Sequence, residues 1–391
     1  MNFNYPKNKN LYLFFAGLIL LVIQIIPIKL DYLGFLSPRS HYYYQNISEN
    51  NIWFISLNPI NTLKYISIYI SCYLIFLITP NLIKNISSLN KTFSIIMWLG
   101  LIHAIYGLLM YFLQLNEFFF YEKISNIDSV TGFFINRNNF SLFLILILII
   151  LVNYLSFYKK YYIDNNEKSY FRYIFSDISL IRMSILIIGI TIILTKSRIG
   201  NISFISFLLF SLFLEIYIKK KFTFLSKIII TMIIADIMII SSLLGLENLF
   251  QRFTSTNLEK ELIRSEIFLF GIKRFQDFMI YGYGLGNFET IFRLEFSNFN
   301  LLYDHIHNDF IEYLGELGIF LSIYFIYIFF KFFKNLINFK NQITLKKIIF
   351  GVILISFIHG NFDFALHMPA IIIFISFVFS LSLCVFEKNK K

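Results

Sequence analysis

Charged side chains are scarce in this sequence. Asp, Glu, Lys and Arg together make up 15% of its 391 residues, whereas soluble domains carry about 25%. Hydrophobic residues reach 57%, and the mean hydropathy is +0.69. So large an apolar excess excludes a soluble protein, because it needs lipid as its solvent. The composition therefore predicts an integral membrane protein.

Cysteine is nearly absent as well. Cys72 and Cys384 are the two cysteines of the chain, and both lie inside apolar runs. One pair so far apart in sequence excludes a disulfide framework. We interpret both as small residues of the core or of the lipid-facing surface.

Motifs that bind nucleotides or metals are also missing. The sequence contains no P-loop, Gly-x-Ser-x-Gly or kinase motif. Gly282, Gly284 and Gly286 lack the flanking strand and helix of a dinucleotide fold, so they predict a tight turn. His305 and His307 form a His-x-His pair, but no Cys cluster, His-Glu-x-x-His motif or acidic triad completes a metal site. We therefore expect no metal and no cofactor.

Long apolar runs are what the sequence has in abundance. A bilayer-spanning helix needs about 20 mostly apolar residues. The first run follows a basic N-terminus but is longer than a usual signal peptide and has no cleavage site after it, so we interpret it as a retained span. The fold class expected is all-α, a polytopic transmembrane helix bundle of about ten spans and at most twelve, forming one membrane domain over residues 1–391. The ten candidate spans are Leu11–Ile28, Leu63–Thr79, Phe93–Leu113, Phe140–Leu155, Met183–Thr195, Ile202–Ile218, Ile228–Leu244, Phe310–Phe330, Ile348–Phe362 and Met368–Phe386.

Lys and Arg set the expected orientation. The net charge is +11, but the basic residues stand in short clusters between the apolar runs, so they argue for membrane topology rather than nucleic-acid binding. Basic residues are dense in the loops on the side of the N-terminus and sparse in the short loops on the other side. The positive-inside rule then places both termini in the cytoplasm.

A long loop at residues 245–309 is expected on the outside face. Thr256 and Glu259 have the spacing of a capping box, which predicts a helix in this loop. An apolar stripe lies on one face of that helix, and Arg264 lies about 120° away from it, toward a polar cavity. Tyr281–Gly286 should end the helix. The stripe consists of Leu258, Leu262, Leu269, Ile272 and Met279.

Five polar clusters stand at the outer ends of the predicted spans. Their coincidence on one face predicts a single site, because the orientation was assigned from Lys and Arg alone. The clusters are Gly132–Asn139, Thr195–Gly200, Arg264 with Ser265, Asp304–Asp309 and His359–Asp363.

Each cluster also has a simpler interpretation. Asn136–Asn139 and His307 with Asn308 are suited to capping helices. Lys196 and Arg198 are suited to anchoring a span at the interface. Arg264 fits a solvated loop, and His359–Asp363 fits an ordinary polar turn.

The chemistry of the clusters points to a substrate that arrives activated, because ATP is not available outside the cytoplasmic membrane. A sugar on a lipid diphosphate meets this condition. Arginine grips phosphate oxygens in bidentate fashion and keeps its charge, so it can stabilise a diphosphate leaving group. A neutral histidine can remove the proton of an acceptor hydroxyl.

Residues 130–370 resemble the O-antigen ligase and O-antigen polymerase family of bacterial inner-membrane proteins. No single motif is decisive, but their order and spacing together are fairly specific. Ile199 departs from the family, in which Gly often follows the Arg directly, and ligases commonly have twelve spans. The segments that carry the resemblance are Gly132–Phe140, Thr195–Gly200, Arg264 with Tyr281–Phe288, His307–Gly318 and Asn361–Ala370.

The resemblance implies transfer of a glycan from undecaprenyl diphosphate to an acceptor at the periplasmic face, without metal or nucleotide. It implies that Arg198 and Arg264 hold the diphosphate and that His307 is the base or positions the acceptor. Glu316 matches a signature residue of the family and is either functional or structural. The further candidates for substrate binding are Asn136, Arg137, Asn138, Lys196, Ser197, Asn308 and Asp363.

Several functions remain open at this point. The expected acceptor is lipid A–core in lipopolysaccharide biosynthesis, which makes the protein a ligase. A polymerase that joins carrier-linked repeats is the main alternative. Transfer of glycan to protein is less favoured, because no further region follows the last span. A glycolipid transporter would favour polar residues at mid-span and internal repeats, and neither is evident.

Overall fold

The apolar runs become long helices in the computed structural model of this chain. Helices account for the spanning segments because only a helix or a closed barrel satisfies every backbone polar group in lipid. Contacts divide the chain into two compact units, each of which is described by itself. The structure describes residues 9–45, 52–115, 117–118, 121–123, 128–162, 177–223, 226–234, 238, 258–296, 303–338 and 343–384.

Seven helices among these residues are long and apolar enough to cross a bilayer, and two shorter apolar helices lie at Leu11–Ile25 and Pro369–Leu383. The protein is therefore an all-α polytopic membrane protein. The predicted span Ile228–Leu244 is described only at 226–234 and 238, where it is helical. The division of residues 1–391 into one membrane domain with a loop at 245–309 stays a prediction.

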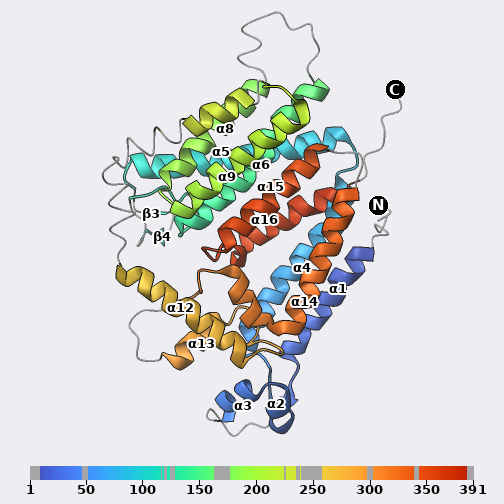
Figure 1. Cartoon of the computed structure of the whole chain (residues 1–391), viewed down its shortest axis with the longest axis vertical. Helices are drawn as coiled ribbons and strands as arrows, with labels where there is room; N and C mark the ends of the chain where they lie inside the picture. Colours follow the sequence, from blue (N-terminus) through green and yellow to red (C-terminus); the bar gives the residue numbers. More distant parts are fainter. Residues whose placement is uncertain are drawn as a thin grey trace, which may run out of the picture. The chain divides into compact units, whose positions relative to one another are not determined.

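The first unit consists of residues 1–81, 257–340 and 360–383. α1 packs against α14, a contact that joins residues nearly 300 positions apart in sequence (Figure 1). Its helices are α1 (Lys9–Val22), α2 (Leu30–Leu36), α3 (Pro38–Gln45), α4 (Pro59–Leu82), α12 (Leu258–Asp277), α13 (Phe288–Glu295), α14 (Asp309–Asn338) and α16 (Pro369–Ser380). Short elements complete the unit: 3₁₀ turns η1 (Ile23–Ile25), η2 (Ala365–His367) and η3 (Leu381–Leu383), and the paired strands β1 (Ile28–Lys29) and β2 (Ile52–Trp53).

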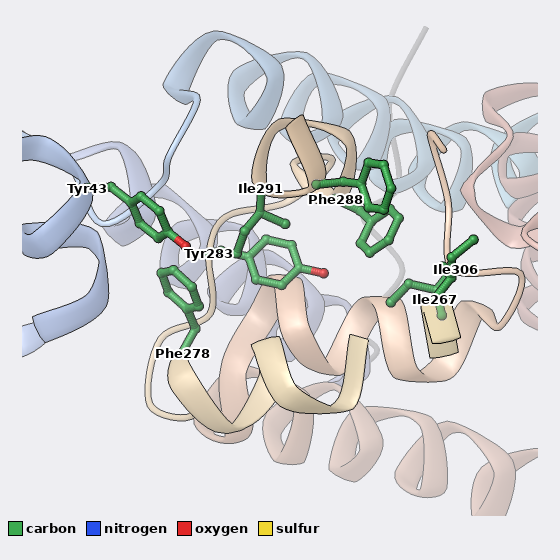
Figure 2. Close-up of a cluster of buried hydrophobic side chains, with 8 residues drawn as sticks. Tyr43, Ile267, Phe278, Tyr283, Phe288, Ile291 and Ile306 are labelled. Carbon is green, nitrogen blue, oxygen red and sulfur yellow. The ribbon is translucent and has the colours of Figure 1, made fainter. Parts of the chain in front are cut away.

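An aromatic core packs together the segments of this unit that lie outside the spans, from α3 and from α12 to the start of α14. Tyr283 is fully buried at its centre, between Phe278 at the end of α12 and Phe288 at the start of α13 (Figure 2). Ile306 reaches the same core, and Gly271 of α12 leaves the space for it, since a Cβ there would lie 2.5 Å from Ile306 Cδ1. Aromatic burial of this kind stabilises a fold strongly. The core therefore anchors the loop that leads into α14.

An ion-pair cluster ties α3 to α12 and α13. Glu295 Oε1 lies 2.6 Å from Arg274 Nη1 and 3.0 Å from Arg39 Nη2, and the Tyr43 hydroxyl bonds to the same carboxylate. Arg274 is buried and also pairs with Asp277 at 3.1 Å. A buried guanidinium needs such partners, because it does not lose its charge.

The helix α14 is broken near its N-terminal end. Gly318 has φ +70° inside the helix, a left-handed conformation that glycine adopts without strain. The carbonyls of Gly315 and Glu316 instead accept from the amides of Tyr283 and Gly284 at 3.0 and 3.1 Å. Gly282, Gly284 and Gly286 all have positive φ. The predicted tight turn at Tyr281–Gly286 is therefore present, and it packs against the break in α14.

The buried face of α12 differs from the predicted apolar stripe. Leu269 and Met279 of that stripe are 62% and 45% exposed, whereas Ile267 and Phe278 are buried. The reason is that α12 packs on α14 through the face that carries Ile267 and Gly271. The proposed cap residue Thr256 lies outside the described residues, as do the side chains of Leu258 and Leu262.

The second unit is built around one fully buried helix. In α6 every side chain from Leu144 to Leu151 has no exposed surface, and a helix that is apolar all round needs this central position. α5 and α8 pack closely on α6 at Gly100, whose position faces Ile147 and Ile188. The helices are α5 (Ile86–Phe112), α6 (Arg137–Tyr162), α8 (Asp177–Leu194), α9 (Arg198–Lys219) and α15 (Ile343–Gly360), with paired strands β3 (Glu117–Phe118) and β4 (Tyr121–Glu122).

Candidate functional site

His307 is held in an unusual backbone conformation just before α14. Its φ is +60°, which costs a non-glycine residue free energy, and such residues are enriched at functional sites. Its Nδ1 lies 3.2 Å from Oδ1 of Asp363, which is fully buried, while the imidazole is 23% exposed. The same carboxylate oxygen accepts from the Phe364 amide at 2.9 Å. A carboxylate bonded to Nδ1 leaves Nε2 for a proton from the accessible side.

Asn308 both caps α14 and ties it to the chain near Asp363. Its Oδ1 accepts from the Ile311 amide at 3.0 Å, and its Nδ2 donates to the Asn361 carbonyl at 3.0 Å. The helix-cap interpretation of Asn308 is therefore confirmed. The structure thus brings together His307, Asn308 and Asp363, three of the predicted site residues.

His305 and His307 have different partners, although they form a His-x-His pair. His305 Nδ1 lies 2.6 Å from Glu312 Oε1, and the second oxygen of Glu312 accepts from the Ile306 amide at 2.8 Å. Burial by itself lowers the pKa of His305, but the Glu312 carboxylate outweighs it and raises the pKa above its ordinary value. The His305 ring also stacks on Phe364, with ring centroids 4.3 Å apart.

His367 lies at the centre of a buried group of carboxylates. Its Nδ1 is 2.5 Å from Asp309 Oδ1, and its Nε2 is 3.4 Å from Glu316 Oε2. Burial opposes the charged imidazole, yet the carboxylates of Glu312 and Glu316 raise the pKa of His367 well above its ordinary value. Tyr313 stacks on the same ring at 3.9 Å. Three acidic residues of α14 therefore converge on an imidazole from η2.

Glu316 has a structural role in addition to its place in this group. Its Oε1 accepts from the Gly286 amide at 2.8 Å, which fixes the glycine turn against α14. Its carbonyl accepts from Nε2 of Gln24 at 2.7 Å, and Oε1 of Gln24 accepts from the Leu285 amide at 3.2 Å. Of the two interpretations left open for Glu316, these bonds favour the structural one.

In the second unit, the segments before α6 and α9 meet. Ser197 Oγ donates to Asn138 Oδ1 at 2.7 Å and accepts from the Gly200 amide at 2.9 Å. Asn136 Oδ1 accepts from the Asn138 amide at 2.8 Å, so the helix-cap interpretation of Asn136 is also confirmed. Gly200 allows the start of α9 to lie close to α6, because a Cβ at this position would overlap Ser141. Two of the predicted polar clusters are therefore joined.

The cations of this second group stand at its surface. Arg198 is the first residue of α9 and is exposed, and Arg137 opens α6 and is half-buried. Lys196 has φ +52° and places its ammonium 5.4 Å from the centroid of the Tyr111 ring. These positions suit contact with a ligand that bears negative charge.

Arg264 lies on the exposed side of α12 in the first unit. It makes no hydrogen bond or ion pair with another residue that the structure describes. Whether Arg198, Arg264 and His307 form one site stays a prediction, because Arg198 belongs to the second unit.

Three residues of the first-unit network, Glu312, His367 and Gln24, were not singled out from the sequence. Asp309, Glu312 and Glu316 recur at i, i+3 and i+7, which places them on one face of α14, and acidic residues in an apolar span indicate function or a buried partner. That spacing was the signal available. His367 and Gln24 come from distant segments, so no local spacing relates them to α14.

Comparison with known proteins supports the resemblance found in the sequence. Residues 183–326 match the family model described as O-antigen ligase. The matched segment runs from α8 into α14 and includes Arg198, Arg264 and His307. No curated protein matches the chain. This match, in a polytopic all-α chain, supports a relationship to the O-antigen ligase and polymerase family.

Proposed function

We propose that this protein is a ligase that transfers a glycan from undecaprenyl diphosphate to lipid A–core at the periplasmic face of the bacterial inner membrane. The family match supports a ligase or polymerase type of function. The observation that carries the proposal is the pair His307–Asp363, a half-buried imidazole whose Nδ1 faces a buried carboxylate. Such a pair suits a general base.

In the proposed step, His307 Nε2 takes the proton of an acceptor hydroxyl while that oxygen attacks the anomeric carbon of the donor sugar. The new bond joins the acceptor oxygen to the anomeric carbon, and the bond from that carbon to the carrier diphosphate breaks. The electron pair leaves with the diphosphate. Asp363 positions the imidazole and stabilises its charged form after proton transfer.

Arg198 and Arg264 are proposed to neutralise the diphosphate as it leaves. A guanidinium stays charged and meets two phosphate oxygens at once, so its stabilisation grows as negative charge develops on the leaving group. Asn136, Arg137, Asn138, Lys196, Ser197 and Asn308 are proposed to contact the substrates. The apolar helix faces would hold the prenyl tail of the donor.

Deletion of the gene tests this function. A ligase mutant accumulates carrier-linked polymer together with bare lipid A–core, as seen when lipopolysaccharide is resolved on gels and probed for glycan. A mutant lacking a polymerase instead carries lipid A–core with one repeat. An unchanged glycan profile in the deletion strain would contradict both assignments.

A further inference from the structure

Five ionisable side chains from three segments of the first unit gather in one buried place. Asp309, Glu312 and Glu316 lie on one face of α14, His305 precedes the helix, and His367 comes from η2. The side chains of the three acids and of His367 are at most 1% exposed, and that of His305 is 11% exposed. Three carboxylates in such a place need positive charge beside them, because unpaired buried charges are very costly.

Two carboxylates of this group face the same ring nitrogen of His367. His367 Nδ1 bonds to Asp309, so Nε2 is the ring atom that faces Glu316 Oε2 at 3.4 Å and Glu312 Oε1 at 3.7 Å. Among the described residues, neither His367 Nε2 nor Glu316 Oε2 has a hydrogen-bond partner, although both are fully buried. Ligand atoms of His305, Glu312 and His367 all lie within 4.8 Å of one another.

One of these distances matches the ligand spacing of a small coordination shell. Four ligands about 2.0–2.2 Å from a tetrahedral ion lie roughly 3.3–3.5 Å from each other, which is the separation of His367 Nε2 and Glu316 Oε2. A carboxylate that holds the other nitrogen of a metal-bound histidine is a recurrent arrangement, and Asp309 occupies that place. The short contact of 2.6 Å between His305 Nδ1 and Glu312 Oε1 would lengthen as both atoms turn to an ion.

We propose that this group binds one divalent transition-metal ion. Its mixed nitrogen and oxygen ligands favour Zn²⁺. His305, Glu312 and His367 are the ligands, Glu316 is the fourth, and Asp309 positions His367. The sequence analysis predicts no metal site, because the histidine ligands come from segments that no local spacing relates to the acidic residues of α14. The site goes beyond the proposed function: the ion joins the loop of His307 to α14 and η2 and takes no part in the transfer step.

Zinc binding by the full-length protein in detergent tests the site. Protein stripped with a chelator is dialysed against buffered Zn²⁺, and bound metal is measured by inductively coupled plasma mass spectrometry. About one ion per chain is expected. His367→Gln and Glu312→Gln should weaken binding at least about 100-fold, and Asp309→Asn about 10- to 100-fold. The matched control is His41→Gln, because His41 lies on α3, outside the group, and this variant should bind as the native chain does.

A second measurement, made on the native chain alone, separates loss of the site from loss of the fold. The apparent melting temperature of the stripped protein should rise when Zn²⁺ is added, because an ion that binds the folded state stabilises it. Co²⁺ in place of Zn²⁺ should give visible absorption of a tetrahedral centre. A native chain that binds no more Zn²⁺ than His367→Gln and shows no rise in melting temperature would overturn the proposal; protonated imidazoles alone would then balance the carboxylates.

Failure of this site and failure of the proposed function give different results. A native chain that binds no added Zn²⁺ and still transfers glycan rules out the metal site and leaves the ligase. A chain that binds one Zn²⁺ in a strain whose glycan profile does not depend on the gene removes the ligase and leaves the metal site.

Discussion

His307 combines a strained backbone with a carboxylate partner and partial exposure, three properties that an ordinary helix-capping histidine does not need. Two neighbours maintain its φ of +60°. Asn308, the next residue, bonds to the Asn361 carbonyl, and Asp363 bonds to the imidazole itself. Strain at a residue persists only where the surroundings enforce it. The geometry at this residue therefore leads to a direct test of its role as a base.

His307→Ala is expected to lower the rate of glycan transfer by about 10²- to 10⁴-fold, the usual contribution of a general base. Asp363→Asn should lower the rate less, because the imidazole remains but loses its partner at Nδ1. Transfer is measured with purified protein and a carrier-linked glycan donor. His41→Ala, on α3, should retain the native rate. Full activity in His307→Ala would remove this residue from the proposed mechanism.

The arginines are tested at the same scale by a substitution that keeps the charge. Arg198→Lys and Arg264→Lys should each lower transfer at least about tenfold, because an ammonium cannot make the bidentate grip on a diphosphate. Arg293→Lys is the matched control, since Arg293 is an exposed arginine paired with Glu289 on α13. Equal rates in Arg264→Lys and Arg293→Lys would show that Arg264 is only a solvated residue.

At the scale of elements, the break in α14 joins three segments of the first unit. The carbonyls released at Gly315 and Glu316 accept from the glycine turn, and Gln24 of η1 donates to the Glu316 carbonyl as well. Helix breaks at membrane depth are tolerated where protein satisfies the free backbone groups. The break is therefore part of what holds the start of α14, with its acidic face, in position.

Gly318→Ala is expected to destabilise the protein by at least about 2 kcal/mol, since alanine resists φ +70°. A Cβ there would also lie 2.5 Å from the Gly282 nitrogen and 2.6 Å from the Ile280 carbonyl oxygen. The apparent melting temperature in detergent should fall by several degrees.

Gly34→Ala is the control for that measurement. Gly34 lies in α2, and a Cβ there would have its nearest contact at 3.4 Å, with the flexible His41 side chain. This variant should be neutral or slightly stabilising, because alanine is the better helix former. Equal melting temperatures for the two variants would contradict the importance of the break.

At the scale of the whole molecule, the positive-inside rule and the proposed chemistry make one common prediction. The His307 loop should face the periplasm, and the end of α9 should face the cytoplasm. Cys72 and Cys384 are both buried, so their replacement by alanine gives a background for single-cysteine labelling. Asp304→Cys and Lys221→Cys place exposed cysteines at the two positions.

A membrane-impermeant maleimide should label Asp304→Cys in cells whose outer membrane has been opened. Lys221→Cys should be labelled only after the inner membrane is disrupted. Labelling in the reverse order would place the His307 loop in the cytoplasm. ATP is available there, so the argument for a preactivated lipid-linked donor would no longer hold.

Much of this protein follows from its sequence alone. Long apolar runs without charge have one stable outcome in lipid, a spanning helix, so the all-α class and the spans at described residues were predictable. The short motifs around Arg198 and His307 were enough for the family resemblance, and both lie in the segment that matches the family model. Asn136 and Asn308, each just before a span, predicted caps for the same local reason.

Tertiary structure decided which distant residues meet. The partner of His307 is Asp363, and the histidine between the acids of α14 is His367, pairings across more than 50 residues that no helical period encodes. It also decided which face of α12 is buried, because Gly271 admits Ile306 while Leu269 and Met279 of the apolar stripe stay exposed. Periodicity states which residues share a face, but packing alone selects the face that is covered.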